Sequence, residues 1–199
     1  MKTILNKKIL IIGNGDLSRE FISSCKFDEK LVTVCAKLEE SDFNIKMLRN
    51  NFSKIYIAIA SPQIRKKFFN QLINNNIIPD TYIHPSVIIG NRTKIGKGCI
   101  IQPNSIISND VVLKDSVFIN FGSIIGHDVN IASFCSLMAN VNLGGHCKLD
   151  NNIFIGTGAI LKPKVKINSN IKIGLGAVVV RNLKKQGSYF GNPASLIVL

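Results

Sequence analysis

The chain has 199 residues, 46% of them hydrophobic, and its 25 Lys and Arg against 12 Asp and Glu give a net charge of +13. This length allows one large or two small domains, and the apolar content excludes a disordered chain. The basic residues are scattered, with no stripe of interleaved aromatics, which disfavours nucleic acid and leaves CoA or nucleotide-linked substrates as candidate anionic partners.

The N-terminus carries no recognisable targeting segment. The apolar run at residues 9–12 is too short for a signal peptide, and no stretch approaches the roughly 18 apolar residues of a membrane span. We therefore expect a cytoplasmic protein without membrane insertion. The five cysteines form no C-x-x-C pair, and we interpret them as reduced, small core residues rather than ligands or nucleophiles.

The first eighty residues predict a small βαβ-type domain. Strands are expected at residues 8–12, 31–35 and 54–60, and helices from residue 16 to about 25 and from 62 to about 75. Gly13 and Gly15 follow the first strand, and such a turn brings backbone N–H groups and a helix N-terminus close to a phosphate. A plain tight turn is the alternative, because the third glycine of the dinucleotide fingerprint is missing.

A six-residue repeat dominates the rest of the chain. From Ile83 to Val179 every sixth residue is Ile, Leu or Val, and the residue four positions after each is mostly small or β-branched. This period fits neither a helix nor a plain strand, but a short strand plus a corner. Three repeats, or 18 residues, would close one triangular coil, and stacked coils would pair as parallel strands about 4.8 Å apart. We predict a parallel β-helix of about six coils over residues 81–199.

His127 is the candidate catalytic residue, in the segment Ile125-Gly-His-Asp-Val129. A neutral imidazole can take the proton of an amine or hydroxyl as it attacks a thioester. Asp128 could orient the ring and raise its basicity. The alternative is an ordinary surface histidine.

Counting in coils places Gly145 directly above His127. A glycine there leaves room beside the imidazole and an unobstructed N–H that could hold the oxyanion of a tetrahedral intermediate. Counting one and two further coils of 18 residues reaches Pro163 and then Arg181. With Lys184 and Lys185 nearby, Arg181 is a candidate for binding CoA phosphates, although a solvated basic face explains it equally well.

The other two histidines do not suggest a metal centre. Neither His84 nor His146 stands at an obvious metal-ligand spacing from His127, so we expect no zinc site.

The whole chain resembles the hexapeptide-repeat sugar acetyltransferases, the group of sialic-acid O-acetyltransferases and bacillosamine-type UDP-4-amino-sugar N-acetyltransferases. The matching motifs are Gly13-Asn-Gly15, Ala58-Ile-Ala with Arg65, Ile83-His-Pro-Ser86, Ile119-Asn120, His127-Asp128, Gly144-Gly145 and Gly191-Asn-Pro-Ala194. The resemblance implies a Rossmann-like nucleotide-sugar-binding domain over residues 1–80, then a left-handed β-helix. It also implies a homotrimer with active sites between subunits.

The same resemblance assigns roles to single residues. His127 would be the general base, with Asp128 as its partner and Asn120 beside the acceptor group. Acetyl-CoA would be the co-substrate, with its acetyl carbonyl at Gly145, and would lie in a groove between subunits past Thr157 and Leu175. The residues expected at the nucleotide or sugar are Gly15, Asp16, Leu17, Ala36 and Ala60.

Three positions depart from the family pattern. Ser136 stands where the family often has a second histidine that contacts acetyl-CoA, so it is a further candidate contact. Cys35-Ala36-Lys37 replaces the usual acidic pair after the second strand, and Ala60 stands where glycine is common. These changes concern the CoA and nucleotide contacts and leave His127 untouched.

The expected function is N-acetylation of a nucleotide-linked 4-amino-sugar in bacterial glycan biosynthesis, by direct transfer from acetyl-CoA. O-acetylation of a sialic-acid-like hydroxyl is the enzyme alternative, since one base serves both reactions. A non-catalytic hexapeptide scaffold is the third reading. It leaves the stacking of Gly145 on His127 unexplained.

Overall fold

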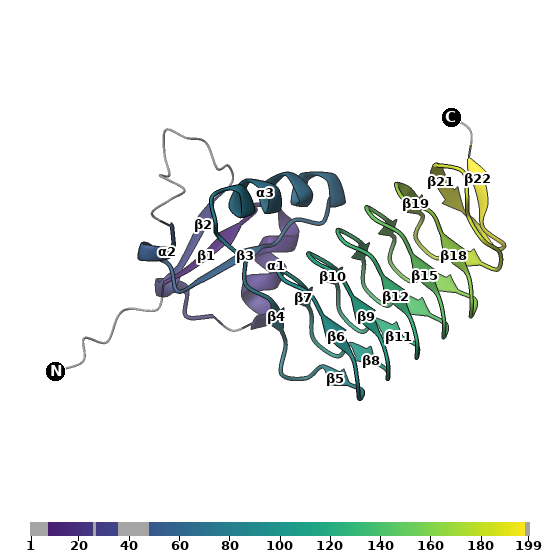
Figure 1. Ribbon diagram of the computed structural model, residues 1–199, viewed down its shortest axis with the longest axis horizontal. Coiled ribbons are helices and arrows are strands. Elements are labelled where there is room, and N and C mark those ends of the chain that lie inside the picture. Colours follow the sequence, from purple (N-terminus) through teal and green to yellow (C-terminus); the bar gives the residue numbers. More distant parts are fainter. Residues whose placement is uncertain (1–7, 26, 36–47, 198–199) are drawn as a thin grey trace.

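The computed structural model describes residues 8–25, 27–35 and 48–197, which form two unlike parts (Figure 1). A small sheet with helices comes first, and a long array of short strands follows. None of the helices in these ranges is both long and apolar enough to cross a membrane.

The first part is a three-stranded parallel sheet in the order β2-β1-β3. The elements of this part are β1 (Ile9–Ile12), α1 (Asp16–Cys25), the 3-10 helix η1 (Glu29–Leu31), β2 (Val32–Cys35), α2 (Leu48–Asn51), β3 (Lys54–Ile57) and α3 (Pro62–Asn74). The predicted strands and both longer helices are present. β3 ends three residues earlier than expected, and the sequence did not predict α2.

Helices cover both faces of β1, which explains why the strand is apolar at successive positions. Leu10 and Ile12 pack in one cluster with Phe69 of α3, whereas Ile11 packs in another with Phe21 of α1. Successive side chains of a strand point to opposite faces, so a strand buried on both sides needs an unbroken apolar run.

α3 begins where the sequence predicts because its first turn is capped. Pro62 occupies the start of the helix, where its missing N–H costs nothing. The Ser61 hydroxyl accepts the N–H of Ile64 at 3.4 Å. The N-terminus of α3 therefore lies just beyond the carboxyl end of β3.

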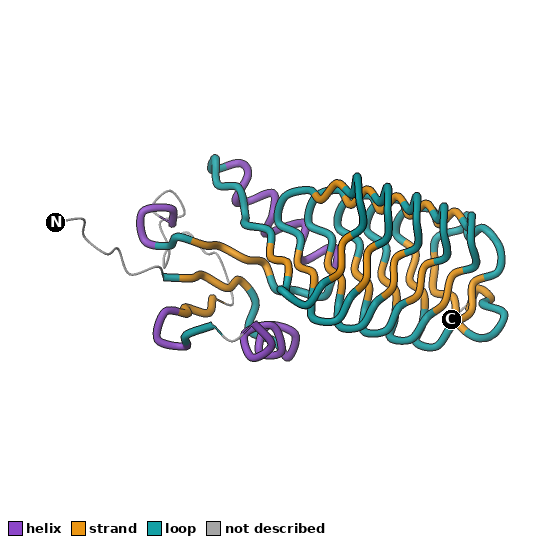
Figure 2. The backbone as a smooth tube through the Cα atoms, turned by 90° about the horizontal axis from the view of Figure 1, so that it is seen from below, coloured by secondary structure: helices purple, strands orange, loops and turns teal. Residues whose placement is uncertain are grey.

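The second part is a parallel β-helix of two-residue strands, in which each strand pairs with the strands one coil away (Figure 2). Sheet 1 contains β4 (Tyr82–Ile83), β7 (Ile100–Ile101), β10 (Phe118–Ile119), β13 (Ser136–Leu137), β16 (Phe154–Ile155) and β19 (Ile171–Ile173). Sheet 2 contains β5 (Ile88–Ile89), β8 (Ile106–Ile107), β11 (Ile124–Ile125), β14 (Asn142–Leu143), β17 (Ile160–Leu161) and β20 (Val178–Val179). Sheet 3 contains β6 (Lys94–Ile95), β9 (Val112–Leu113), β12 (Asn130–Ile131), β15 (Lys148–Leu149) and β18 (Lys166–Ile167).

The C-terminal end departs from the parallel pattern. β21 (Gly187–Phe190) continues sheet 1 in parallel beside β19, but β22 (Ser195–Ile197) turns back and pairs with β21 in the antiparallel direction. The six-residue repeat has ended before this point, so the repeat could not predict the hairpin.

The predicted inward series is the core of the β-helix. From Ile101 to Val179 every sixth residue is at most 2% exposed, so the period-six prediction is confirmed. Ile83 and Ile89, in the first coil, are 37% and 40% exposed because no coil lies beneath them. Three cysteines share this core as fully buried free thiols, which confirms their interpretation as reduced core residues: Cys99, Cys135 and Cys147.

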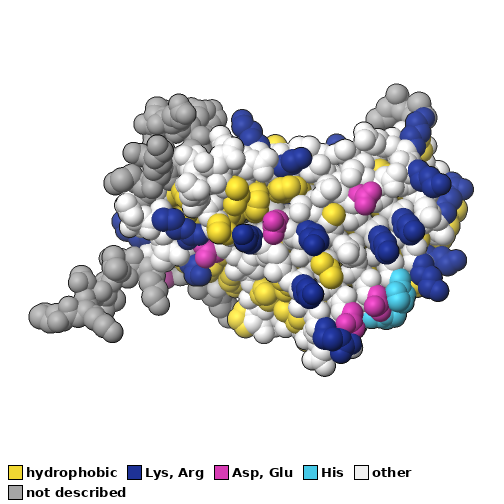
Figure 3. Space-filling model, viewed as in Figure 1, with side chains coloured by type: hydrophobic (Ala, Val, Ile, Leu, Met, Phe, Trp, Pro, Cys, Tyr) yellow, Lys and Arg dark blue, Asp and Glu magenta, His cyan; other side chains and the backbone are white. Residues whose placement is uncertain are grey.

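The three sheets face different surroundings. Ile100 and Phe118 of sheet 1 pack against Ile11, Phe21 and Tyr56 of the first part, so that part covers β7 and β10 of sheet 1. Sheet 2 presents isoleucines to solvent and sheet 3 presents mainly lysines and asparagine. Lys and Arg side chains are spread over the face seen in Figure 3 rather than gathered into a stripe.

Candidate active site

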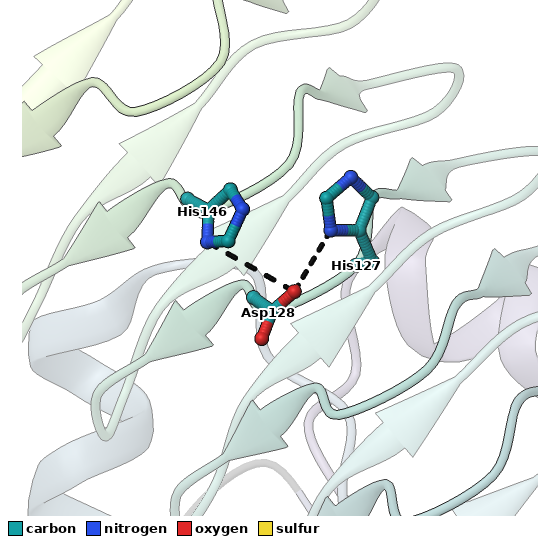
Figure 4. Close-up of side chains that lie close together, drawn as sticks. All are labelled: His127, Asp128 and His146. Atoms are coloured by element: carbon teal, nitrogen blue, oxygen red, sulfur yellow. Dashed lines mark hydrogen bonds and ion pairs between the residues drawn. The ribbon is translucent and has the colours of Figure 1, made fainter.

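His127 lies at the corner that joins sheet 2 to sheet 3, directly after β11. Its side chain is 59% exposed, and its Nδ1 lies 2.8 Å from Oδ2 of Asp128 (Figure 4). A carboxylate only accepts hydrogen bonds, so Nδ1 carries the proton and donates it. The neutral ring then keeps its lone pair on Nε2, which is the nitrogen available to accept a proton from a substrate.

Gly145 lies against the Nε2 side of this imidazole, as the coil count predicts. A Cβ atom at residue 145 would stand 2.7 Å from Nε2 of His127, closer than real contacts allow. One residue later, the N–H of His146 donates to the carbonyl of His127 at 2.9 Å, which fixes the two coils in register. Glycine at position 145 is therefore required for the observed ring position.

The N–H of Gly145 has no hydrogen-bond acceptor among the described residues. At the same corner three coils earlier, the N–H of Asn91 donates to the side chain of Asn109, one coil further on. The residue one coil beyond Gly145 is Pro163, which offers no side-chain acceptor. The geometry thus leaves a free donor in the residue that adjoins Nε2.

His146 also belongs to this cluster, which the sequence analysis missed. It lies one coil above Asp128, and its Nδ1 is 3.9 Å from the same carboxylate oxygen. Its ring meets that of His127 edge to face, with centroids 4.9 Å apart. The spacing of His146 from His127, 19 residues, does not indicate this contact, whereas its spacing of 18 residues, one coil, from Asp128 does.

Two of the expected acetyl-CoA contacts lie at a different corner. Thr157 and Leu175, one coil apart, line a cavity of about 320 Å³ at the corner that joins sheet 1 to sheet 2, together with Met138, Phe154 and Phe190. Asn120 occupies the same corner, mostly buried, where its Oδ1 accepts the N–H of Phe121 at 2.8 Å. A single chain therefore does not bring these residues to His127.

Ser136 does not fit the role expected of it. Its side chain is fully buried under the first part of the chain. The hydroxyl donates to the carbonyl of Ala60 at 2.6 Å and accepts from Nη1 of Arg65 at 2.7 Å. Because both partners occupy the hydroxyl and no surface is left, Ser136 is a packing residue here and not a contact to acetyl-CoA.

Arg181 continues the corner of His127 and Gly145 toward the C-terminal end, after β20, and its side chain is exposed. Its neighbours Lys184 and Lys185 are exposed as well. This end of the corner therefore carries three cations in five residues, available to an anionic ligand.

The residues expected at the nucleotide gather at the carboxyl edge of the small sheet. Gly15, Asp16 and Leu17 lead from β1 into α1, and Ala60 follows β3. Gly13 holds the turn close to β3, since it has a φ of 122° and a Cβ there would lie 2.6 Å from the carbonyl oxygen of Ala58. Ala36 falls outside the described residues.

The stacked short strands, with an inward aliphatic residue at every sixth position, define a hexapeptide-repeat β-helix. The chain belongs to the family described as GMPPB C-terminal domain, whose model matches residues 71–173.

Named relatives agree with the expected class. The GDP-perosamine N-acetyltransferase of Escherichia coli O157:H7 is 29% identical over 172 residues, 78% of each chain. Serine acetyltransferase 3 of Arabidopsis thaliana is 29% identical over 120 residues, 56% of this chain and 30% of that one. These matches confirm the resemblance to hexapeptide-repeat acetyltransferases.

Solved structures share the whole architecture. PerB from Caulobacter crescentus, solved with CoA and GDP-perosamine, has a TM-score of 0.83 and 26% identity over 96% of this chain and 97% of its own. The acetyltransferase domain of PglB from Neisseria gonorrhoeae has a TM-score of 0.83 and 22% identity, covering 96% and 100%. The first part and the β-helix thus recur together in both structures.

Proposed function

We propose that this protein is an acetyl-CoA-dependent N-acetyltransferase that acts on a nucleotide-linked 4-amino-sugar. The observation that carries the proposal is the arrangement of His127, Asp128 and Gly145, in which a base with a free Nε2 adjoins an unpaired N–H. GDP-perosamine, named for both the E. coli relative and the PerB structure, supports a nucleotide-linked amino sugar as acceptor.

The chemistry follows from this arrangement. The amine of the sugar attacks the thioester carbonyl carbon while Nε2 of His127 accepts a proton from the nitrogen. Asp128 stabilises the imidazolium that forms. The N–H of Gly145 is placed to hold the oxyanion. As the C–S bond breaks, the thiolate of CoA leaves and takes the proton from His127, which restores the neutral base.

The exposed faces support a homotrimer with its active sites between subunits. Along the outward side of sheet 2, four isoleucines one or two coils apart are 39–63% exposed: Ile88, Ile106, Ile124 and Ile160. Asn142 interrupts this row, but exposed apolar side chains gathered on one face favour an interface. Sheet 2 lies between the two corners of the site. Three copies packed by sheet 2 around an axis would set the Thr157 corner of one chain against the His127 corner of the next.

In this proposal the two parts of the chain have different roles, one in substrate binding and one in acetyl transfer. Residues 1–80 form a Rossmann-like domain that holds the nucleotide or sugar at Gly15, Asp16, Leu17 and Ala60, and residues 81–199 form a left-handed β-helix that performs the transfer. The parallel sheet supports this assignment, because ligands of such sheets bind beyond the carboxyl ends of the strands. Thr157, Leu175 and Arg181 would receive acetyl-CoA.

A thiol-release assay tests the function. The enzyme is incubated with acetyl-CoA and, separately, with GDP-, UDP- or dTDP-linked 4-amino-sugars or with free sialic acid. We expect CoA release with an amino sugar, and a loss of about 100- to 10,000-fold in kcat for His127→Ala. His84→Ala, which changes a half-buried histidine outside the site, is the matched control.

Three outcomes would reject the proposal. Release with sialic acid alone would identify an O-acetyltransferase. Full turnover by His127→Ala would contradict the assigned mechanism, and no release with any acceptor would favour a scaffold.

A further inference from the structure

We propose that His127, Asp128 and His146 form a binding site for a divalent transition metal of the Zn²⁺ type, and that the bound ion inhibits the enzyme. Binding depends only on these side chains, whereas inhibition rests on the function proposed above. In this view the ion is a regulator that competes with catalysis and has no part in the reaction.

The three ligand atoms already converge. A ring nitrogen of His127, a carboxylate oxygen of Asp128 and a ring nitrogen of His146 all lie within 4.8 Å of one another (Figure 4). The carboxylate oxygen is 2.8 Å from the first nitrogen and 3.9 Å from the second. Zinc–ligand bonds of about 2.0–2.2 Å place tetrahedral ligands roughly 3.3 Å apart, so small rotations of these exposed side chains complete the geometry.

The backbone of the β-helix produces this convergence. Asp128 and His146 occupy equivalent turn positions one coil apart, and both are in the left-handed region, with φ of 57° and 61°. Their side chains therefore leave the corner in parallel, one above the other. The chain has only three histidines, and two of them meet at one carboxylate. Figure 3 shows histidine and acidic side chains gathered at one edge of the molecule.

The donor set and its surroundings suit a transition metal. Two imidazoles and one carboxylate are ligands that zinc, nickel and cobalt accept, and the exposed site leaves a position open for water. Asp110, one coil below Asp128, pairs with Arg92 at 2.6 Å. The charge of the Arg92 guanidinium is therefore balanced by Asp110, and the carboxylate of Asp128 remains available to a metal ion.

The bound ion would disable the base. Coordination takes the Nδ1 lone pair of His127, so the neutral ring must carry its proton on Nε2, and the Asp128 carboxylate then binds the metal instead of Nδ1–H. Nε2 is then an N–H donor with no free lone pair, so it cannot accept the proton of the attacking amine.

Titration of the metal-free full-length protein with Co²⁺ tests binding, followed by visible absorption and by calorimetric competition with Zn²⁺. We expect one site per chain with imidazole and oxygen ligands, and no thiolate-to-cobalt charge-transfer band, because the core cysteines are buried. His146→Asn should weaken binding by at least about tenfold. His84→Asn should leave metal binding unchanged, because the ring of His84 is held by Ser86 and lies outside this cluster.

Inhibition is measured separately. For each variant we determine the Zn²⁺ concentration that halves the acetyl-transfer rate relative to the rate of the same variant without metal. In His146→Asn, we expect this concentration and the dissociation constant for the metal to rise by the same factor. Equal binding by His146→Asn and the parent, or none by the parent, overturns the site; binding without inhibition overturns the regulatory role. If no acceptor is turned over, the Co²⁺ titration still decides the site by itself.

Discussion

The two nitrogens of the His127 ring have different tasks. Nδ1 is held by Asp128, whereas Nε2 lies beside Gly145, a residue that has no side chain. This asymmetry is what a general base requires, because the ring must be fixed through one nitrogen and open at the other. Gly145 is thus as much a part of the site as the histidine itself.

Gly145→Ala should disable catalysis without unfolding the protein. The new Cβ would lie 2.7 Å from Nε2 of His127, so the exposed ring must swing away from its observed position. We expect kcat to fall by about 100-fold, the usual cost of misplacing a reacting group by an ångström. The melting temperature should change little, because the displaced ring is exposed.

A double-mutant cycle tests whether this effect acts through the histidine. In a His127→Ala background, Gly145→Ala should reduce the remaining rate no further, because the ring that it displaces is absent. Independent, multiplicative losses would instead show that the alanine disturbs the site in another way.

At the scale of single elements, period and packing determine what the sequence can reveal. Each coil has the same length, so a count of 18 residues predicted the contact between Gly145 and His127, and the same count from Asp128 finds His146. Ser136 could not be placed in this way. Its partner Arg65 lies 71 residues earlier, on a helix of the other part, and no repeat encodes that contact.

Arg65 joins α3 to the β-helix as a fully buried cation. Its guanidinium donates to the carbonyls of Ser116 and Cys135 at 3.0 and 2.9 Å. Burial lowers the pKa of Arg65 to about 10, so the group stays charged at neutral pH. Arg65→Met should lower the free energy of unfolding by about 2–5 kcal/mol, because buried carbonyls lose their donors.

Chemical denaturation measures this change. Arg19→Met, which removes an exposed ion pair with Asp16, is the matched control and should cost less than about 1 kcal/mol. Equal costs for the two substitutions would show that Arg65 does not hold the two parts together.

The thiols of the core cysteines should be unreactive toward alkylating reagents in the folded protein. Burial raises the pKa of Cys99 to about 11 and that of Cys135 to about 12, so the reactive thiolate is scarce at pH 8. Alkylation at pH 8 followed by peptide mass spectrometry should label these two only after denaturation. Half-buried Cys25 serves as the internal comparison. Labelling of Cys135 at the same rate in native and denatured protein would contradict the structure.

At the scale of the whole molecule, the proposed site needs residues from two copies of the chain. The base is at one edge of sheet 2 and the cavity lined by Thr157 and Leu175 is at the other. The first strands of sheet 1 are already covered by the first part, and sheet 3 presents mainly lysines and asparagine, so sheet 2 is the apolar face left for a neighbour. Assembly and catalysis should therefore fail together.

Ile106→Lys combined with Ile160→Lys tests this coupling. Both side chains are exposed in the single chain, at 39% and 48%, so lysine should not disturb its fold. We expect the mass measured by sedimentation to fall from that of three chains to the 21.9 kDa of one chain. The reason is that ammonium groups buried in the interface oppose assembly. The acetyl-transfer rate should fall by at least about 100-fold, since the base would no longer face the acetyl group.

Val112→Lys is the matched control, because it makes the same kind of change on the outward side of sheet 3. It should leave both the sedimentation and the rate unchanged, and circular dichroism should show that all the variants remain folded. A monomer with full activity would show that each chain holds a complete site, and a trimer formed by the double variant would move the interface away from sheet 2. Only a joint loss of assembly and activity agrees with a base and an acetyl-CoA groove contributed by different subunits.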